Sequence, residues 1–360
     1  MSSLPCKREL QSFLQQQFKD CKVVVLPDFF LDRLINLELS PQEFSNLVVE
    51  VTKRKGGALD GILQTNLRGG NAINVASALA SLGANVTPIV CTSEFGLQQI
   101  KFSFQNIPID TSNIKTQGKA SITTALEFSE KNIKTNVMLR DLGALADFGP
   151  SNLNERDFML IDNSDYLCVF NWAGTLKFGT DLAQAVFGRA KHNGKGKTYY
   201  DTADPTPNSK AIPDLMDKIL KTDKVDILSL NENEAVTYAS FLDEGIMEKR
   251  NRLSYSELAM ESARVLARLL PARIDLHTTE FSATLKGKNE VEVPTFKVKT
   301  LRATGAGDAW CAGNILGDHN DLSDECRLML ANVVAACYLS DPNGQHPTKQ
   351  KIMSFLKTSA

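Results

Sequence analysis

A glycine-rich turn that ends in an aspartate is the stretch of this sequence best suited to chemistry. It reads Thr304-Gly305-Ala306-Gly307-Asp308 and opens into small apolar residues at 309–313, as expected at the buried start of a helix. The first turn of a helix presents unpaired N–H groups and the positive end of a dipole, so it can hold an anion. An anion hole beside a carboxylate is what phosphoryl transfer to a hydroxyl requires, with Asp308 as the base. The alternative interpretation is a strand-to-helix turn in which Asp308 caps the helix.

Two other segments carry polar side chains that fit the same chemistry. Gly69-Gly70-Asn71 leads through Asn74 into an alanine-rich helix that ends near Gly83, and its amides can bond hydroxyl groups. Asn231 and Glu234 lie three residues apart at a helix start, where they could order water around a magnesium–nucleotide complex. An N-capped helix packed by alanine and ordinary compensation of a helix dipole are the alternatives.

Strands must position these groups, and several polar residues follow predicted strands directly. Asp28 and Asp32 come after the apolar run 21–26, and Asn171 comes after 166–170. Ligands of open α/β sheets bind beyond the carboxyl ends of the strands, so this is a favoured place for a substrate-binding carboxylate. The alternative is that these residues are a turn aspartate and a surface aspartate. Strand and helix alternate from about residue 150 onward, which predicts a parallel sheet with helical crossovers. The further strands expected are 86–90, 198–200, 225–230 and 274–277, with a β-pair at 281–286 and 291–299.

The remaining segments predict additions to this sheet. An amphipathic helix is expected over 5–20, and helices over 306–316, 324–338 and 348–356. The run Val48 to Val51 with Lys55-Gly56-Gly57 suggests a strand and a hairpin turn. Alternating residues at 120–128 and 134–139 predict an antiparallel pair, which could join that hairpin in a small sheet covering the main domain.

Composition restricts the partners. Of the 360 residues 42% are apolar and 23% charged, which is typical of a soluble globular protein. The net charge of −2 gives no general attraction for nucleic acid or for an anionic membrane, and no apolar run approaches the length of a membrane span. The seven cysteines form no Cys-x-x-Cys pair and are expected to be buried thiols in a reducing compartment. With no signal-peptide core at the N-terminus, we expect a cytoplasmic protein.

The residues at 69–83, 231–234 and 303–313 resemble, in this order, the signatures of the ribokinase-like carbohydrate kinases, also called the phosphofructokinase B family. The resemblance extends over roughly 21–345. It implies a three-layer α/β/α sandwich with a mostly parallel central sheet and a small β-sheet lid. We expect an N-terminal helical extension at 1–20, before the residues that the resemblance covers. The resemblance implies a kinase domain at 21–360, with lid strands inserted at about 36–68 and 110–139.

The resemblance also implies a role for each matching residue. Asp308 would be the base, and the backbone of Gly305, Ala306 and Gly307 would form the anion hole. Asn231 and Glu234 would hold the nucleotide phosphates and, through water, Mg²⁺. Thr278 and Asn332 would lie nearer the rest of the nucleotide. The acceptor would be bound by Asp32, Gly70, Asn71, Asn74 and Asn171.

Two departures from the family pattern concern the donor side. Arg302-Ala303 stand where the family usually has Asp-Thr, which puts a monovalent-cation site in doubt. The region His277 to Ser282 lacks both glycines of the usual nucleotide loop, so ATP is the expected donor with ADP as an alternative.

The acceptor is expected to be a small molecule, a sugar or sugar derivative, with a ribonucleoside as the alternative. An aromatic wall formed by Phe29, Phe30 or Trp172 would favour the nucleoside, and Arg68 and Arg140 are candidates for contact with an acceptor phosphate. A catalytically silent binding protein is the alternative from another class. An oxidoreductase is disfavoured because no dinucleotide fingerprint is present. A homodimer through the lid is a further expectation.

Overall fold

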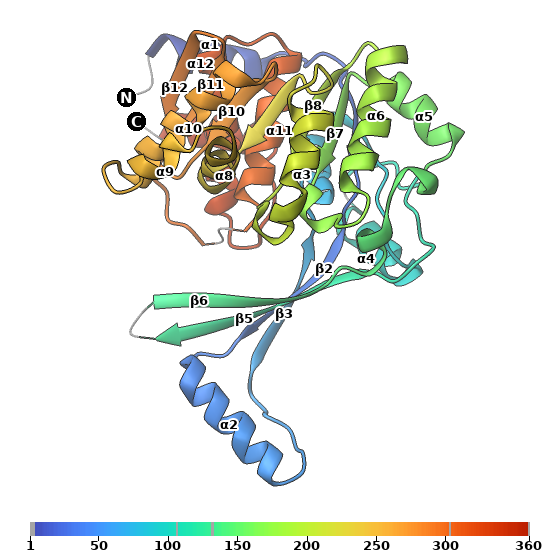
Figure 1. Ribbon diagram of the computed structural model, residues 1–360, viewed down its shortest axis with the longest axis vertical. Coiled ribbons are helices and arrows are strands. Elements are labelled where there is room, and N and C mark those ends of the chain that lie inside the picture. The colour runs from blue at the N-terminus through green and yellow to red at the C-terminus, as the bar shows by residue number, and fades with distance from the viewer. Residues whose placement is uncertain (1–3, 106, 131–132, 302–303, 359–360) are drawn as a thin grey trace.

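The central element is an eight-stranded sheet in the order β12-β11-β10-β9-β8-β7-β1-β4, seen in a computed structural model that describes residues 4–105, 107–130, 133–301 and 304–358 (Figure 1). Neighbouring strands from β4 to β10 run parallel, whereas β11 and β12 are antiparallel. The strands are β1 (Lys22–Leu26), β4 (Asn85–Pro88), β7 (Tyr166–Phe170), β8 (Lys197–Asp201), β9 (Ile227–Leu230), β10 (Arg273–His277), β11 (Phe281–Lys286) and β12 (Asn289–Pro294).

Helices cover both faces of this sheet. Successive residues of β1 alternate between the two faces, so that Val23 and Val25 enter one hydrophobic cluster and Val24 and Leu26 the other. The first cluster includes side chains of α1 (Leu4–Gln15), α3 (Asn71–Ser81), α4 (Glu94–Ser103), α11 (Ala306–His319), α12 (Asp324–Leu339) and α13 (Lys349–Thr358). The second includes side chains of α5 (Glu155–Asp162), α6 (Gly179–Asn193), α7 (Ile212–Leu215), α8 (Glu232–Leu242), α9 (Gly245–Lys249) and α10 (Tyr255–Leu269). The chain therefore forms the α/β/α arrangement expected for a ribokinase-like fold.

A second, four-stranded sheet projects from this body in the order β3-β2-β5-β6 (Figure 1). Its strands are β2 (Phe30–Asn36), β3 (Leu63–Gly69), β5 (Ser121–Glu130) and β6 (Ile133–Asp141). β2 pairs antiparallel with β3 and parallel with β5. Since β2 follows β1 after only three residues and β3 leads directly into α3, this sheet is connected to the main body beside the carboxyl end of β1.

The predicted strand and hairpin at 48–57 are wrong, because this segment contains helix α2 (Pro41–Lys53), which joins β2 to β3. Ser40 accepts a hydrogen bond from the Glu43 N–H, and the Glu43 carboxylate accepts one from the Ser40 N–H. This reciprocal cap and Pro41 in the first turn start the helix despite its valines. Gly56 and Gly57 have positive φ angles and follow the helix end rather than forming a hairpin.

Two other boundaries differ from those expected. The N-terminal helix ends at Gln15 rather than near residue 20. The segment that follows the helix contacts the residue after α11, since the Lys19 N–H donates to Asn320 Oδ1 at 3.0 Å. The last strand is β12, which ends at Pro294 instead of continuing to 299, because proline has no N–H for the ladder.

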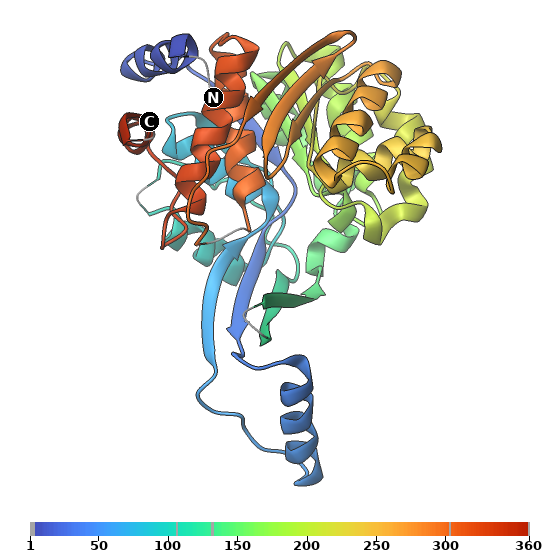
Figure 2. The same cartoon turned by 90° about the vertical axis from the view of Figure 1, so that its left-hand side faces the viewer.

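Helix α1 packs against α12 and α13, so the two ends of the described chain lie on one side of the molecule (Figure 2). The expectation that all cysteines are free thiols is wrong for one pair, since the sulfur atoms of Cys6 on α1 and Cys326 on α12 lie in disulfide contact. The other five cysteines are buried and free. Within the described ranges no helix combines the length and apolar character that a membrane crossing needs.

Candidate active site

The turn before α11 is built so that only glycine fits at its centre. Gly305 has a φ of 91°, and a Cβ there would lie 2.7 Å from the Tyr338 hydroxyl oxygen. That hydroxyl donates to the Thr304 carbonyl at 2.9 Å and holds the turn from α12. This turn therefore fixes the position of the first N–H groups of α11. An anion site at a helix start requires N–H groups held in this way.

Asp308 lies in the first turn of α11 and is held by α3. Asn71 Nδ2 donates to one carboxylate oxygen at 2.8 Å, and Asn74 Nδ2 donates to the other at 2.9 Å. Burial raises the pKa of Asp308 to about 7, with Asp201 and Asp28 adding to the rise and the two amides opposing it. The cap position of α11 is Gly305, so the alternative in which Asp308 caps this helix does not apply.

The start of α3 is anchored by a buried carboxylate. Asp28 accepts from the Asn71 N–H at 2.9 Å, from the Ala72 N–H at 2.8 Å and from Asn171 Nδ2 at 2.9 Å. Gly70 makes the turn with a φ of 97°, and a Cβ there would lie 2.7 Å from Phe29 Cα. Asp28 thus fixes the first turn of α3, from which Asn71 and Asn74 reach Asp308.

Replacing Asp28 by alanine should therefore destabilise the protein. The change leaves two helix N–H groups and a buried amide without their acceptor, and we expect unfolding free energy to fall by about 2–4 kcal/mol. Urea unfolding followed by circular dichroism measures this, with Asp60→Ala in the exposed loop after α2 as the control. A loss no greater than that of the control would refute the anchoring role.

Asp32 lies on β2 with one carboxylate oxygen unused. Oδ1 is buried and has no hydrogen-bond partner among the described residues. Burial raises the pKa of Asp32 to about 6, with a contribution from Asp28, while a Thr123 hydrogen bond and Arg140 oppose the rise. Gly69 on β3 makes room for this side chain, since a Cβ there would overlap the Asp32 carboxylate. The free oxygen can accept a hydrogen bond from a ligand.

A second acidic group lies at the ends of β8 and β9. Asn231 and Glu234 cap α8 reciprocally, with Asn231 Nδ2 donating to Glu234 Oε1 at 2.7 Å and the Glu234 N–H donating to Asn231 Oδ1 at 3.0 Å. Burial, then Asp201, raises the pKa of Glu234 well above its ordinary value, and burial raises that of Asp201 to about 6. Such crowding of buried carboxylates would be relieved by a divalent cation.

The side chains of Thr278 and Asn332 form hydrogen bonds to other groups of the protein. Thr278 Oγ1 donates to the Phe281 carbonyl at 2.7 Å and closes a tight turn between β10 and β11, as the glycine-free sequence suggests. The Asn332 side chain is buried, accepts from Trp310 Nε1 at 2.9 Å and donates to the Pro294 carbonyl at 3.1 Å. Asn171 likewise binds Asp28 and the Gly174 N–H. Arg302 and Ala303 lie outside the described residues.

Sequence reasoning missed how Arg68 acts. Its Nε donates to Asn74 Oδ1 at 3.3 Å, and its guanidinium stacks over Phe104 at 5.0 Å. Arg68 thus orients the amide that holds Asp308. The available signal was its position directly before Gly69-Gly70. The anchoring role of Asp28 toward α3 was also missed, although its position directly after the β1 segment was visible in the sequence.

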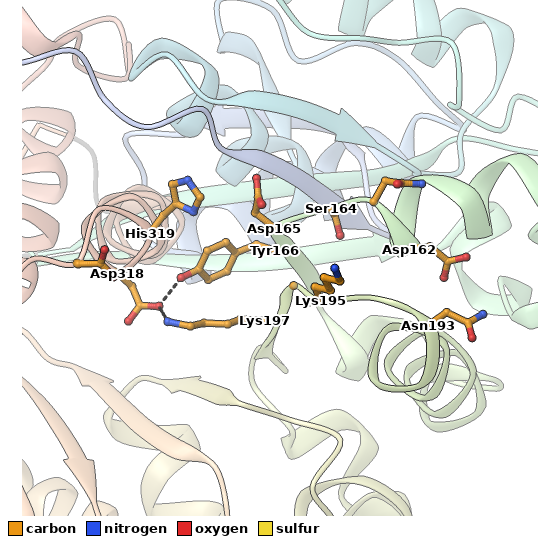
Figure 3. Close-up of a pocket in the computed structure, with 12 residues that line it drawn as sticks. Asp162, Ser164, Asp165, Tyr166, Asn193, Lys195, Lys197, Asp318 and His319 are labelled. Carbon is orange, nitrogen blue, oxygen red and sulfur yellow. Dashed lines mark hydrogen bonds and ion pairs between the residues drawn. The ribbon is translucent and has the colours of Figure 1, made fainter.

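A polar cavity of about 550 Å³ lies at the opposite edge of the sheet, at the amino ends of β7 and β8 (Figure 3). Within it the Lys197 ammonium pairs with Asp318 at 2.6 Å, and Tyr166 also donates to Asp318. Its lining includes Asp162, Asp165, Asn193 and Lys195. This cavity is separate from the Asp308 region, which lies at the carboxyl edge of the sheet.

Comparison with known proteins identifies the family to which the chain is similar. Residues 52–351 match the pfkB family carbohydrate kinases. Similar solved structures include a ribokinase from Arabidopsis thaliana complexed with ribose and ATP, at 15% identity and a TM-score of 0.71, and an adenosine kinase from Sinorhizobium meliloti, at 16% identity and 0.68; each alignment covers 95% of this chain and 100% of the other. A nucleoside kinase from Methanocaldococcus jannaschii aligns at 16% identity and 0.65, over 95% and 99% of the two chains.

At these identities the solved structures establish the fold alone, and no curated protein sequence matches the chain. The family match extends over most of the sequence and includes the Asp308 turn. The chain therefore belongs to the pfkB family of carbohydrate kinases, phosphotransferases that act on sugar hydroxyls.

Proposed function

We propose that this protein is a nucleotide-dependent kinase that transfers a phosphoryl group to a hydroxyl of a sugar or sugar derivative. The observation that carries the proposal is the buried Asp308 carboxylate, held by two amides in the first turn of α11 and with a pKa raised to about 7. A general base works best with a pKa near the working pH, and the anion-binding helix start lies within the same turn.

In the proposed reaction Asp308 accepts the proton of the acceptor hydroxyl. The hydroxyl oxygen bonds to the terminal phosphorus of the donor, and the bridging oxygen leaves on the donor with its electron pair. The N–H groups of Gly305, Ala306 and Gly307 stabilise the charge on the moving phosphoryl group. Asp32 orients the acceptor through its unpartnered oxygen, and Gly70 lets the acceptor approach the backbone.

Magnesium fits the donor side of this site, because Asp201 and Glu234 are buried carboxylates: burial raises the pKa of both, and Asp201 further raises the pKa of Glu234. Glu234, with Asn231, would hold the ion through water. Bound Mg²⁺ would neutralise charge on the nucleotide phosphates. We propose ATP as the donor and retain ADP as the alternative, because the tight β10–β11 turn cannot wrap a nucleotide as a glycine-rich loop would.

The buried aromatic residues favour a sugar over a nucleoside as the acceptor. Phe29, Phe30 and Trp172 are 1%, 4% and 1% exposed, so they serve the core rather than an open wall for a base. A ribonucleoside kinase of the same family remains the second candidate. A catalytically silent binding protein is disfavoured because the Asp308 turn is intact. We further propose that the β3-β2-β5-β6 sheet is a lid over the acceptor, since Asp32 lies on it.

A transfer screen tests the proposal. The protein is incubated with Mg²⁺ and either ATP or ADP, together with panels of sugars, sugar phosphates and nucleosides, and products are read by mass spectrometry. We expect phosphorylation within the sugar panels. Transfer only to nucleosides would establish the second candidate, and ligand binding without transfer by either donor would favour the silent protein.

A further inference from the structure

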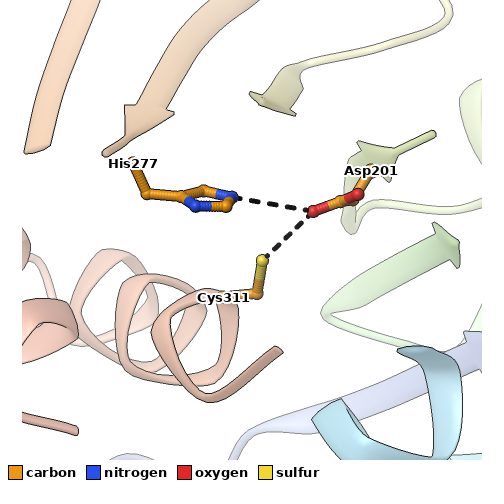
Figure 4. Close-up of side chains that lie close together, drawn as sticks. All are labelled: Asp201, His277 and Cys311. Carbon is orange, nitrogen blue, oxygen red and sulfur yellow. Dashed lines mark hydrogen bonds and ion pairs between the residues drawn. The ribbon is translucent and has the colours of Figure 1, made fainter. Parts of the chain in front are cut away.

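Three side chains with metal-binding atoms converge beside the candidate active site (Figure 4). Asp201 ends β8, His277 ends β10 and Cys311 lies in the second turn of α11. One possible ligand atom from each lies within 4.8 Å of the other two. Among the described residues this is the group of metal-binding side chains that the structure brings together. Neither the family match nor the proposed function assigns a role to His277 or Cys311, and Asp201 enters the proposed function only as a buried carboxylate beside Glu234.

The neighbours of His277 fix the direction of its ring. A Cβ on Gly307 would lie 3.1 Å from His277 Cε1, and the ring lies against Trp310 with centroids 5.0 Å apart. Its Nε2 faces Asp201 Oδ2 at 4.0 Å, is buried, and has no hydrogen-bond partner among the described residues. A buried ring nitrogen without a partner is costly, and a bound ion would satisfy it.

Cys311 faces the same point because it lies one turn after Gly307 on α11. Its sulfur lies 3.5 Å from Asp201 Oδ2. The His277 and Asp201 side chains retain 15% and 10% exposure, so solvent and ions can reach the group. The three side chains are thus largely buried, and an ion can still reach them from solvent.

Two of the three distances between these atoms can be compared with those of a tetrahedral zinc site. Bonds of about 2.3 Å to sulfur and about 2.0 Å to oxygen put those two atoms about 3.5 Å apart, and a ring nitrogen and an oxygen about 3.3 Å apart. The sulfur–oxygen distance here is 3.5 Å, and the nitrogen–oxygen distance of 4.0 Å must shorten slightly. Thiolate and imidazole ligands select a borderline-soft ion over Mg²⁺.

We infer that Asp201 Oδ2, His277 Nε2 and Cys311 Sγ form a binding site for Zn²⁺ or a similar divalent transition-metal ion, distinct from the magnesium site expected at Asn231 and Glu234. Three protein ligands leave one position of the tetrahedron for a non-protein ligand. The inference does not depend on kinase activity, because the test reads metal binding alone.

The test uses Co²⁺ as a spectroscopic probe on the full chain, after treatment with a chelator and a reductant that are then removed. We expect one ion per chain, with the intense visible bands of tetrahedral cobalt and a thiolate-to-cobalt charge-transfer band, both abolished by Zn²⁺. Cys311→Ser should remove the charge-transfer band, and His277→Gln should weaken binding by at least about tenfold. Cys337→Ser, at a buried cysteine outside the cluster, should change neither.

Circular dichroism of each variant separates lost binding from lost folding, and His277→Gln carries the test if Cys311→Ser does not fold. The inference is overturned if wild-type protein gives no stoichiometric thiolate–cobalt spectrum, or if that spectrum survives in folded Cys311→Ser. A weak octahedral spectrum alone would also overturn it, since it would mean binding only by carboxylates. Failure of the transfer screen, by contrast, would leave these results unchanged.

Discussion

Asp308→Asn should lower the turnover number of phosphoryl transfer by about 10²–10⁴, the usual contribution of a positioned general base. The substitution keeps the shape of the side chain but removes its ability to accept the hydroxyl proton. It also turns an acceptor of two amide hydrogen bonds, from Asn71 and Asn74, into a group that can accept only through one oxygen. Steady-state kinetics with the acceptor found in the screen measures the loss.

The control is Asp181→Asn on α6, an exposed aspartate away from the site. Calorimetric titration of the acceptor should show that Asp308→Asn still binds it, because the lost interaction belongs to the transition state. If acceptor affinity fell while turnover stayed the same, Asp308 would be a binding residue rather than the base.

Asp32→Asn should raise the KM for the acceptor about 10- to 150-fold, while the KM for the nucleotide changes little. This range corresponds to the 1.5–3 kcal/mol of a hydrogen bond to a charged group. The expectation follows from the buried Oδ1, which has no partner among the residues that the structure describes and which a substrate hydroxyl would satisfy. An amide in its place keeps the volume but loses the charge.

Arg33→Gln is the matched control for Asp32→Asn. Arg33 is the next residue of β2, so its side chain points to the other face of the sheet, where it is exposed. Equal weakening of acceptor and nucleotide by Asp32→Asn would contradict the placement of the acceptor at this carboxylate.

The parallel strands could be predicted because each is a short, buried apolar run. β7, for example, is buried at all five positions, and its sequence is continuously apolar. Helix α2 was mistaken for a strand because Val48, Val49 and Val51 are residue types that favour strands. Two helix signals were present in the sequence: apolar residues at helical spacing (Phe44, Leu47, Val48 and Val51) and the Ser40 and Glu43 capping pair.

The candidate site, like the fold, could be predicted from the sequence only in part. Local motifs indicated the Asp308 turn and the start of α3. The contacts between them could not be predicted, because Asn74 and Asn71 precede Asp308 by 234 and 237 positions and reach it only through the packing of α3 against α11. No local signal indicates that Asp201, His277 and Cys311 meet, because they come from three separate elements. The roles of Asn231, Glu234, Thr278 and Asn332 toward a nucleotide stay predictions.

The role of Asp308 as the base is tested by the pH dependence of kcat/KM for the acceptor, compared between wild type and Asp308→Asn. This quantity reports ionisations of the free enzyme. Asp308 has a pKa raised to about 7 and acts as a base only when ionised, so wild-type kcat/KM should rise with pH and level off above about pH 7. Below about pH 6 it should fall more steeply, as Asp32 is protonated too.

In Asp308→Asn the rise near pH 7 should disappear and only the change near pH 6 should remain. A wild-type profile that is flat from pH 6 to 8, or a rise near pH 7 that persists in the variant, would contradict the account of Asp308 as the base.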